Sequence, residues 1–257
     1  MSSSTSENEG ADTDRSLQLP EVVRKAWGLT SPGRRGPRAE LSLQRVVATA
    51  IRLADAHGLG QVSMARIADE LGFTTMSLYR HLRSKEELLV HLQDAVLGVP
   101  PSQSTDGVLW RDGLATWTRE LFEVYTRHDW VLDIPISGPP VMPHNLQWMD
   151  WAFAIMESIP LRSGEKLSIL LLLSGYARNE ATLARGLRGR SDKNNGEDQD
   201  YERSLRLLVT ADHLPALHRA IEDTGLFDAA PETDAGTFDF GLARILDGIE
   251  VMVDGLS

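Results

Sequence analysis

A glycine turn between two short helical patterns restricts the fold of this chain more than any other feature. Ser63 is a helix-capping residue type, and Ile67 and Leu71 lie four positions apart on one helical face. Gly72 follows at the position where a helix ends in the left-handed conformation, which glycine adopts without steric cost. The pattern predicts two short helices that meet at Gly72 in an all-α chain.

The segment after this turn predicts a second short helix that presents several side chains to solvent. Thr74 is a suitable cap, and Leu78 and Leu82 fall on the inward side. The outward side and the amino-terminal end carry Thr75, Met76, Ser77, Tyr79, Arg80 and His81. Two helices arranged in this way form a helix-turn-helix, whose second helix lies in the major groove of DNA.

Two longer helices complete a compact bundle over residues 41–98. Ser84, with Glu87 three positions later, has the spacing of a capping box and predicts the start of a further helix. Upstream, Ser42 precedes a long helical pattern that Gly58 ends. The sequence therefore predicts a four-helix amino-terminal domain built around the helix-turn-helix.

The charge distribution separates DNA binding from a generic helical hairpin, which is common in all-α domains. Residues 22–93 hold eleven Lys and Arg against six Asp and Glu, whereas the whole chain carries a net charge of −11. The remainder therefore carries −16. A basic segment on an acidic chain is typical of a DNA-binding part, because phosphate contacts supply most non-specific affinity.

Residues 41–98 resemble the DNA-binding domain of the tetracycline-repressor (TetR) family of bacterial transcription regulators. The resemblance rests on the runs IADELG at 67–72, SLYRHL at 77–82 and SKEELL at 84–89. The later runs similar to the subgroup nearest the tetracycline repressors are WRDGLATWTRELF at 110–122, HDW at 128–130 and PHN at 143–145. The resemblance implies a homodimer that sets two recognition helices in successive major grooves of a roughly palindromic double-stranded DNA operator.

The resemblance also implies where DNA is contacted. The positions that match base- or phosphate-contacting residues of the family are Ser63, Arg66, Thr75, Met76, Ser77, Tyr79, His81 and Lys85. Arg80 is our candidate for reading a base, because arginine is the natural bidentate partner of guanine, or else for a phosphate. Tyr79 alternatively packs against the domain and exposes only its hydroxyl.

Residues 1–40 form an extension ahead of this domain. Residues 1–16 are polar and acidic, which predicts disorder, and residues 17–29 are apolar enough for one extra short helix. The basic run 31–38, which ends at Arg38, either lies in the adjacent minor groove or is a solvated arm. The chain has no signal peptide, no membrane-spanning run and no cysteine, which favours a cytoplasmic protein without a membrane partner.

Residues 102–257 are acidic and keep a helical pattern, and the resemblance assigns effector binding and dimerisation to them. Helices are expected near 106–128, 144–158, 163–186, 199–222 with a break at Pro215, and 237–254, with a polar loop at 188–200. The helix around 167–183 is apolar on more than one face, so it lies either inside the monomer or against a partner, and apolar residues repeat at helical spacing over 238–252. In the family, two such helices pair across the dimer as a four-helix bundle.

Aromatic side chains gather in this second domain and predict a pocket for a small-molecule effector. The candidate ligand-binding residues are Trp117, Tyr125, His144, Trp148, Trp151, Tyr176 and Asn179. Pockets are mainly apolar with a few polar groups, although any single aromatic residue is better explained as ordinary core. His144 either orients a ligand or faces water at a helix start. The tetracycline repressors hold a magnesium-chelated drug with histidines and a carboxylate. This chain does not reproduce that set, so we predict no cofactor and no metal site.

The motifs of common enzyme classes are missing from the sequence. It has no P-loop, no glycine-rich dinucleotide fingerprint and no His-Glu-x-x-His, and an all-α chain lacks the setting of a nucleophile elbow. We therefore expect a ligand-responsive transcriptional repressor and no catalytic residues. The alternative is a helical scaffold or adaptor that uses its amino-terminal domain for protein contacts without specific DNA binding.

Overall fold

The computed structural model describes residues 19–29, 41–101, 105, 107–136, 138–191, 197–223 and 234–256, and every regular element in these ranges is helical. The elements are α1 (Glu21–Ala26), α2 (Leu43–His57), η1 (Leu59–Gln61), α3 (Met64–Leu71), α4 (Thr75–Leu78), α5 (Lys85–Leu97), α6 (Trp110–Arg127), η2 (Asp129–Asp133), α7 (Pro143–Ile155), α8 (Ser163–Ser191), α9 (Glu197–Leu208), α10 (Pro215–Asp223) and α11 (Asp234–Asp254). The predicted all-α fold is confirmed. No helix in the described part of the chain is long and apolar enough to cross a membrane.

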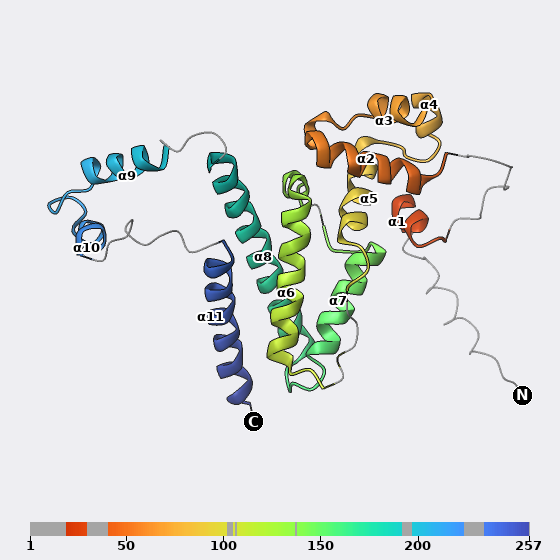
Figure 1. Ribbon diagram of the computed structural model, residues 1–257. Coiled ribbons are helices and arrows are strands. Elements are labelled where there is room, and N and C mark those ends of the chain that lie inside the picture. The colour runs from red at the N-terminus through yellow and green to blue at the C-terminus, as the bar shows by residue number, and fades with distance from the viewer. Residues whose placement is uncertain are drawn as a thin grey trace, which may run out of the picture.

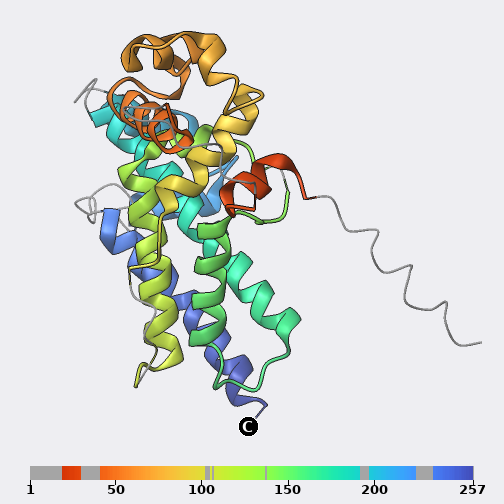
Figure 2. The same ribbon diagram turned by 90° about the vertical axis from the view of Figure 1, so that its right-hand side faces the viewer.

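The helices form two parts that meet along α5 (Figure 1). Helices α2 to α5 make a small bundle at one end, and α6, α7, α8 and α11 extend away from it. The short α1 packs against α5 and lies beside the start of α7 in both views (Figures 1 and 2). Helices α9 and α10 project to one side in Figure 1.

Serine caps and a left-handed glycine set the ends of helices in the small bundle, as the sequence predicts. The Ser42 hydroxyl accepts a hydrogen bond from the Arg45 amide at 3.2 Å, and the Ser63 hydroxyl accepts one from the Arg66 amide at 3.2 Å. Gly72 ends α3 with φ +72°, the left-handed conformation that side chains disfavour. Each of these devices satisfies backbone groups that a helix end leaves unpaired.

Two caps differ from the expectation. The Thr74 hydroxyl makes no backbone cap but lies 3.0 Å from the Ser77 hydroxyl. At α5, Ser84 caps the Glu87 amide as predicted, yet Glu87 accepts from the amide of Arg83 at 2.7 Å, so only half of the capping box forms. Glu87 is displaced because its other carboxylate oxygen binds Lys25, 3.2 Å away on α1.

The core of the small bundle includes a segment from the second part of the chain. Leu78 and Leu82 are fully buried, as their spacing predicts, together with Ile67, Leu88 and Leu92. The residues of η2 and its end that pack into the same core are Trp130, Val131 and Ile134. The two parts are therefore joined by shared apolar packing and not only by the chain connection.

Several boundaries in the second part differ from the expectation. The first long helix begins at Trp110 rather than near 106. The predicted loop at 188–200 is helical at both ends, because α8 continues to Ser191 and α9 begins at Glu197, and residues 192–196 lie outside the described residues. The break near Pro215 is confirmed, since α9 ends at Leu208 and α10 begins at Pro215, where a first-turn proline needs no amide hydrogen. The extra short helix within 17–29 is also confirmed as α1.

Gly113 on α6 lets α7 approach closely, and its substitution tests that packing. An added Cβ would lie 2.7 Å from Cγ2 of Ile155. We expect Gly113→Ala to lower the free energy of unfolding by about 1–3 kcal/mol, the usual cost of overpacking, despite the better helix propensity of alanine. Urea denaturation followed by tryptophan fluorescence measures the change.

The matched control is Gly186→Ala on α8, because a Cβ there meets open space. This variant should gain up to about 1 kcal/mol from helix propensity alone. Equal stabilisation of both variants would contradict the close approach of α6 and α7.

Candidate DNA interface and domain junction

The turn after α3 exposes a group of side chains suited to nucleic acid. Met76 is 72% exposed and Tyr79 is 47% exposed, and both project from α4 or the turn that follows it. Arg80 is exposed and makes no hydrogen bond or ion pair with the described residues. An unpaired arginine beside an apolar and a phenolic side chain offers contacts to base edges, thymine methyl groups and phosphates.

The two predicted DNA-contacting residues at α3, Ser63 and Arg66, also make hydrogen bonds within the protein. Ser63 uses its hydroxyl to cap α3, and the guanidinium of Arg66 donates to the side-chain oxygen of Gln61 at 3.3 Å. Both residues reach the surface of the small bundle, Ser63 more than Arg66. Arg38, predicted to end a basic arm, lies outside the described residues.

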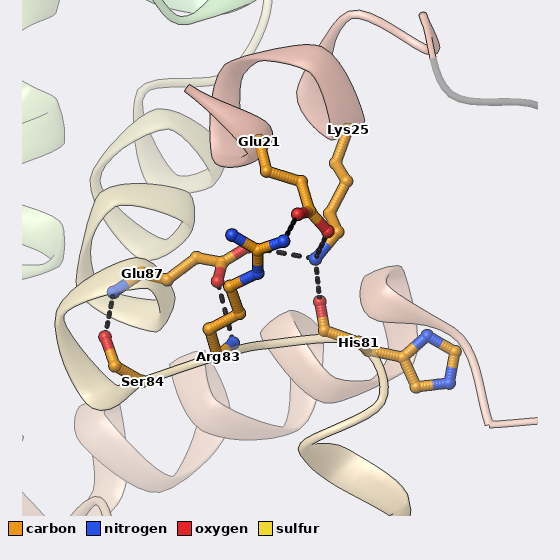
Figure 3. Close-up of polar contacts among 6 residues, drawn as sticks. All are labelled: Glu21, Lys25, His81, Arg83, Ser84 and Glu87. Atoms are coloured by element: carbon orange, nitrogen blue, oxygen red, sulfur yellow. Dashed lines mark hydrogen bonds and ion pairs between the residues drawn. The ribbon is translucent and has the colours of Figure 1, made fainter. Parts of the chain in front are cut away.

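The remaining predicted contacts flank α4. Thr75 and Ser77 are half-buried, and Lys85 is exposed at the first position of α5. The His81 imidazole is half-buried and points away from the polar cluster that surrounds its own carbonyl (Figure 3). These positions surround one end of the small bundle, and their contacts to DNA remain predictions.

A buried carboxylate on α5 holds the amino-terminal end of α7. Asp94 Oδ1 accepts hydrogen bonds from the backbone amides of His144 at 2.9 Å and Asn145 at 3.2 Å, and from the Asn145 side-chain amide at 3.2 Å. The capping residue of α7, Met142, has no polar side chain. Asp94 therefore caps α7 from another helix, and its charge lies where a helix N-terminus favours an anion.

His144 reinforces this junction. Its Nδ1 lies 2.9 Å from the Asp94 carbonyl oxygen and 3.0 Å from the Asp94 Oδ2 atom. Both neighbours only accept hydrogen bonds, so Nδ1 carries the proton. The side chain that the sequence offered as a ligand contact is thus engaged in joining α5 to α7.

A second carboxylate joins α2 to the segment around η2. Asp55 Oδ1 accepts from the indole Nε1 of Trp130 at 2.7 Å and lies 2.7 Å from His128 Nδ1. On the other side of η2, the Arg178 guanidinium of α8 donates to the carbonyl oxygens of Leu132 and Ile134 at 2.9 and 3.0 Å. The η2 segment is therefore held from both parts of the molecule.

The predicted tryptophans come together, but as closely packed core. Trp117, Trp148 and Trp151 are each at most 5% exposed, and their rings meet edge to face with centroid separations of 6.0 and 5.6 Å. The Trp117 indole donates to the Trp148 carbonyl at 2.9 Å, and the Trp148 indole donates to the Gly98 carbonyl at 3.0 Å. These two indole donors are satisfied within the protein, as buried tryptophans require.

Two further predicted ligand residues, Tyr125 and Tyr176, pack against the hydrophobic cluster that holds the tryptophans. Tyr125 packs against both hydrophobic cores, and burial raises the pKa of its phenol while the Arg178 guanidinium near its ring opposes the shift. Tyr176 donates its hydroxyl to the Phe238 carbonyl at 2.8 Å, and burial, helped by Glu180, raises its pKa to about 12. Asn179 is exposed on α8.

A shallow cleft of about 240 Å³ lies between α6 and α11. Its lining residues are Arg111, Asp112, Ala115, Thr116, Arg119, Asp239, Leu242, Ala243 and Leu246. None of the predicted ligand residues is among them. The cleft is crossed by ion pairs such as Arg119 to Asp239 at 2.9 Å, and it is smaller than pockets that enclose drug-sized ligands.

Comparison with protein families accounts for both parts of the chain. The model described as bacterial regulatory proteins of the tetR family matches residues 46–92, which hold the glycine turn and α4. The model described as the tetracyclin repressor-like C-terminal domain matches residues 101–253. The chain belongs to the TetR family. The resemblance carried by residues 67–89 is therefore confirmed.

TetR-family relatives share most of the length of this chain. The HTH-type transcriptional repressor DrrR1 of Streptomyces coeruleorubidus is 33% identical over 94% of this chain and 89% of its own. The tetracycline repressor protein class C of Escherichia coli is 25% identical over 83% of this chain and 92% of its own. The crystal structure of ActR from Streptomyces coelicolor in complex with actinorhodin has a TM-score of 0.69 and 25% identity, with 86% of this chain and all of that chain covered.

This TetR-family chain is a DNA-binding transcriptional repressor that responds to a small-molecule ligand. The adaptor alternative is not favoured. Sequence reasoning missed the residues that join its two parts, namely Asp55 and Asp94, and the contact from Trp27 to Val141. One signal was present, because Asp94 is a charged residue within the apolar spacing of α5, two positions after the buried Leu92.

Removal of the Asp94 carboxylate tests the junction. Asp94→Ala leaves the His144 and Asn145 amides without their acceptor, so we expect a loss of about 2–4 kcal/mol in the free energy of unfolding. Asp150→Ala, which removes an exposed carboxylate from α7, should change it by less than about 0.5 kcal/mol. Equal urea midpoints for the two variants would show that Asp94 does not cap α7.

Proposed function

We propose that this TetR-family repressor acts as a homodimer on a roughly palindromic operator and is released by a multi-ring small molecule bound within residues 102–257. The observation that carries the proposal is the exposed group of Met76, Tyr79 and Arg80 on a domain whose helices are joined to the second part through Asp94. Because the DNA-binding surface and the effector-binding part are in direct contact, an effector that favours one conformer can alter the affinity for the operator.

Each α4 lies in a major groove of the operator. Arg80 reads a guanine or binds a phosphate, Met76 contacts a thymine methyl group, and Lys85 binds a phosphate at the start of α5. Tyr79 is exposed enough to donate its hydroxyl to a phosphate. From its sequence, the basic run that ends at Arg38 is proposed as a further DNA contact.

The homodimer is supported by apolar side chains that the single chain leaves exposed on two neighbouring helices. On α8 these are Leu167, Leu171, Leu172 and Leu183, and on α11 they are Phe240, Val251 and Met252. Large apolar patches on adjacent helices mark interaction surfaces, and a two-fold dimer would bury both sets against their copies. The resulting four-helix bundle fixes the distance between the two α4 helices.

The effector class is supported by a structural relative and by the aromatic cluster. Crystal structures of ActR show it in complex with actinorhodin and with (S)-DNPA. In this chain, Trp117, Trp148 and Trp151 supply the aromatic surface against which rings of such a ligand pack. Because that cluster is closed in the described structure, the effector must favour a conformer in which these side chains separate.

The protein is cytoplasmic and acts by binding alone, without catalysis. Residues 41–98 form the DNA-binding domain, and residues 102–257 form the effector-binding and dimerisation domain. The operator is obtained by selecting sheared genomic DNA on the purified protein near physiological salt and sequencing the retained fragments. Enrichment of a few palindromic sites supports the proposal, whereas retention without sequence preference contradicts it.

Two charge-removing substitutions separate base reading from phosphate binding. We expect Arg80→Ala to weaken the selected operator by about 1–3 kcal/mol and to weaken random DNA less, because a bidentate base contact is lost. We expect Lys85→Ala to weaken both DNAs by a similar factor and to reduce the salt dependence by about one phosphate contact. Fluorescence anisotropy at several salt concentrations measures both. Equal losses on operator and random DNA for Arg80→Ala would exclude its base-reading role.

A pair of Trp→Phe variants tests the effector site. With actinorhodin as the probe, Trp148→Phe should raise the concentration that releases half of the operator complex by about tenfold, equivalent to about 1.4 kcal/mol. Operator affinity without actinorhodin should not change. Trp110→Phe, a partly buried residue at the start of α6, is the control and should release as wild type does. Release that is unaffected in both variants would remove Trp148 from the site, and no release of the wild type would exclude this effector.

A further inference from the structure

The short helix α1 places a lysine beside His81 (Figure 3). His81 lies near the end of residues 75–82, which hold α4 and the turn after it and are called the DNA-reading segment below. The Lys25 ammonium donates to the His81 carbonyl at 2.9 Å and to Glu87 Oε1 at 3.2 Å, and it pairs with Glu21 Oε1 at 3.0 Å. An ammonium group has three donors, so each of them has a partner here. Lys25 is thus fully engaged inside the protein.

The charged cluster of Glu21, Lys25, Arg83 and Glu87 also holds the connection between α4 and α5. The Arg83 guanidinium pairs with Glu21, and the Arg83 amide donates to Glu87 Oε2 at 2.7 Å (Figure 3). Two cations and two carboxylates make the cluster electrically neutral. It therefore adds little attraction for phosphate, and its effect on DNA binding acts through the position of the backbone.

The other end of α1 reaches the second part of the molecule. The Trp27 indole donates to the Val141 carbonyl at 2.9 Å, two residues before α7 begins. Between these ends, Val23 is 3% exposed, and α1 packs against α5 (Figure 2). One short helix thus contacts both the end of the DNA-reading segment and the approach to α7.

We propose that α1 acts as a strut between the two parts of the molecule. Lys25 is a positioning residue for α4, and Trp27 transmits a displacement of the amino-terminal end of α7 to α1. This inference rests on the proposed function, in which α4 binds the operator and the effector shifts the second part. Lys25 fixes the carbonyl at the end of the segment that follows α4, so its loss leaves α4 free to change its angle to the groove.

Lys25→Met tests the DNA-facing end of the strut, with Arg24→Met as the matched control. Both remove one positive charge from α1, but Arg24 is exposed and its guanidinium makes no hydrogen bond or ion pair with the described residues. We expect Lys25→Met to weaken the operator about tenfold, the scale of one lost charge-assisted hydrogen bond, with the salt dependence of wild type. Arg24→Met should stay within about twofold of wild type.

Hydrogen exchange of the free protein provides a readout that does not depend on the operator. Amides in residues 79–84 should exchange faster in Lys25→Met than in Arg24→Met, while those of α5 are unchanged. Glu21→Gln, which removes both ion pairs of Glu21 but keeps the bond to His81, should fall between them. If wild-type protein selects no operator, the proposed function fails, and the exchange data still decide whether Lys25 holds this segment.

Trp27→Phe tests the other end. It removes the indole donor and keeps an aromatic ring, so operator affinity should be retained while the shift in operator affinity caused by actinorhodin becomes smaller. Equal exchange and equal operator affinity for the Lys25 and Arg24 variants would overturn the positioning role. An unchanged actinorhodin response in Trp27→Phe would overturn the transmitting role.

Discussion

The carboxylate of Asp94 is the interaction on which the joint between the two parts depends. A buried carboxylate is costly unless it is paired and fully hydrogen-bonded. Here it is satisfied by the first amides of α7, the Asn145 side chain and the His144 imidazole. Because Met142 offers α7 no cap of its own, neither partner is complete without the other. Helix α5 therefore belongs equally to the small bundle and to the second part of the molecule.

The helix termini that the sequence predicts correctly depend on local interactions. Ser63, Gly72 and Ser84 act on backbone groups within four residues, so their roles follow from spacing alone. The bond from Lys25 to His81 spans 56 residues and that from Trp27 to Val141 spans 114, and no periodic pattern encodes such pairs. The incomplete capping box shows the same limit, because Glu87 is drawn away by a lysine on a helix that the local motif does not include.

The predicted ligand residues illustrate a different limit. A ligand wall and a hydrophobic core both require large aromatic surfaces, so the tryptophan-rich composition predicts the cluster but not which role it has. The hydrogen bond from the Trp148 indole to the Gly98 carbonyl shows that this side chain also fixes the end of α5. In the proposed function, a ligand that displaces Trp148 would therefore also alter the α5 terminus.

The energies of the two carboxylate joints indicate which of them an effector can open. Ligand coupling energies are typically about 1–3 kcal/mol, and leaving a buried carboxylate and the α7 amides without partners costs about 2–4 kcal/mol. Opening the Asp94 joint would therefore consume most or all of the free energy that such a coupling supplies. Asp55 is more accessible, with a side chain 37% exposed against 8% for Asp94, so water can replace its partners His128 and Trp130 at lower cost. The balance favours the Asp55 contact as the one that an effector opens, while Asp94 keeps α5 and α7 together.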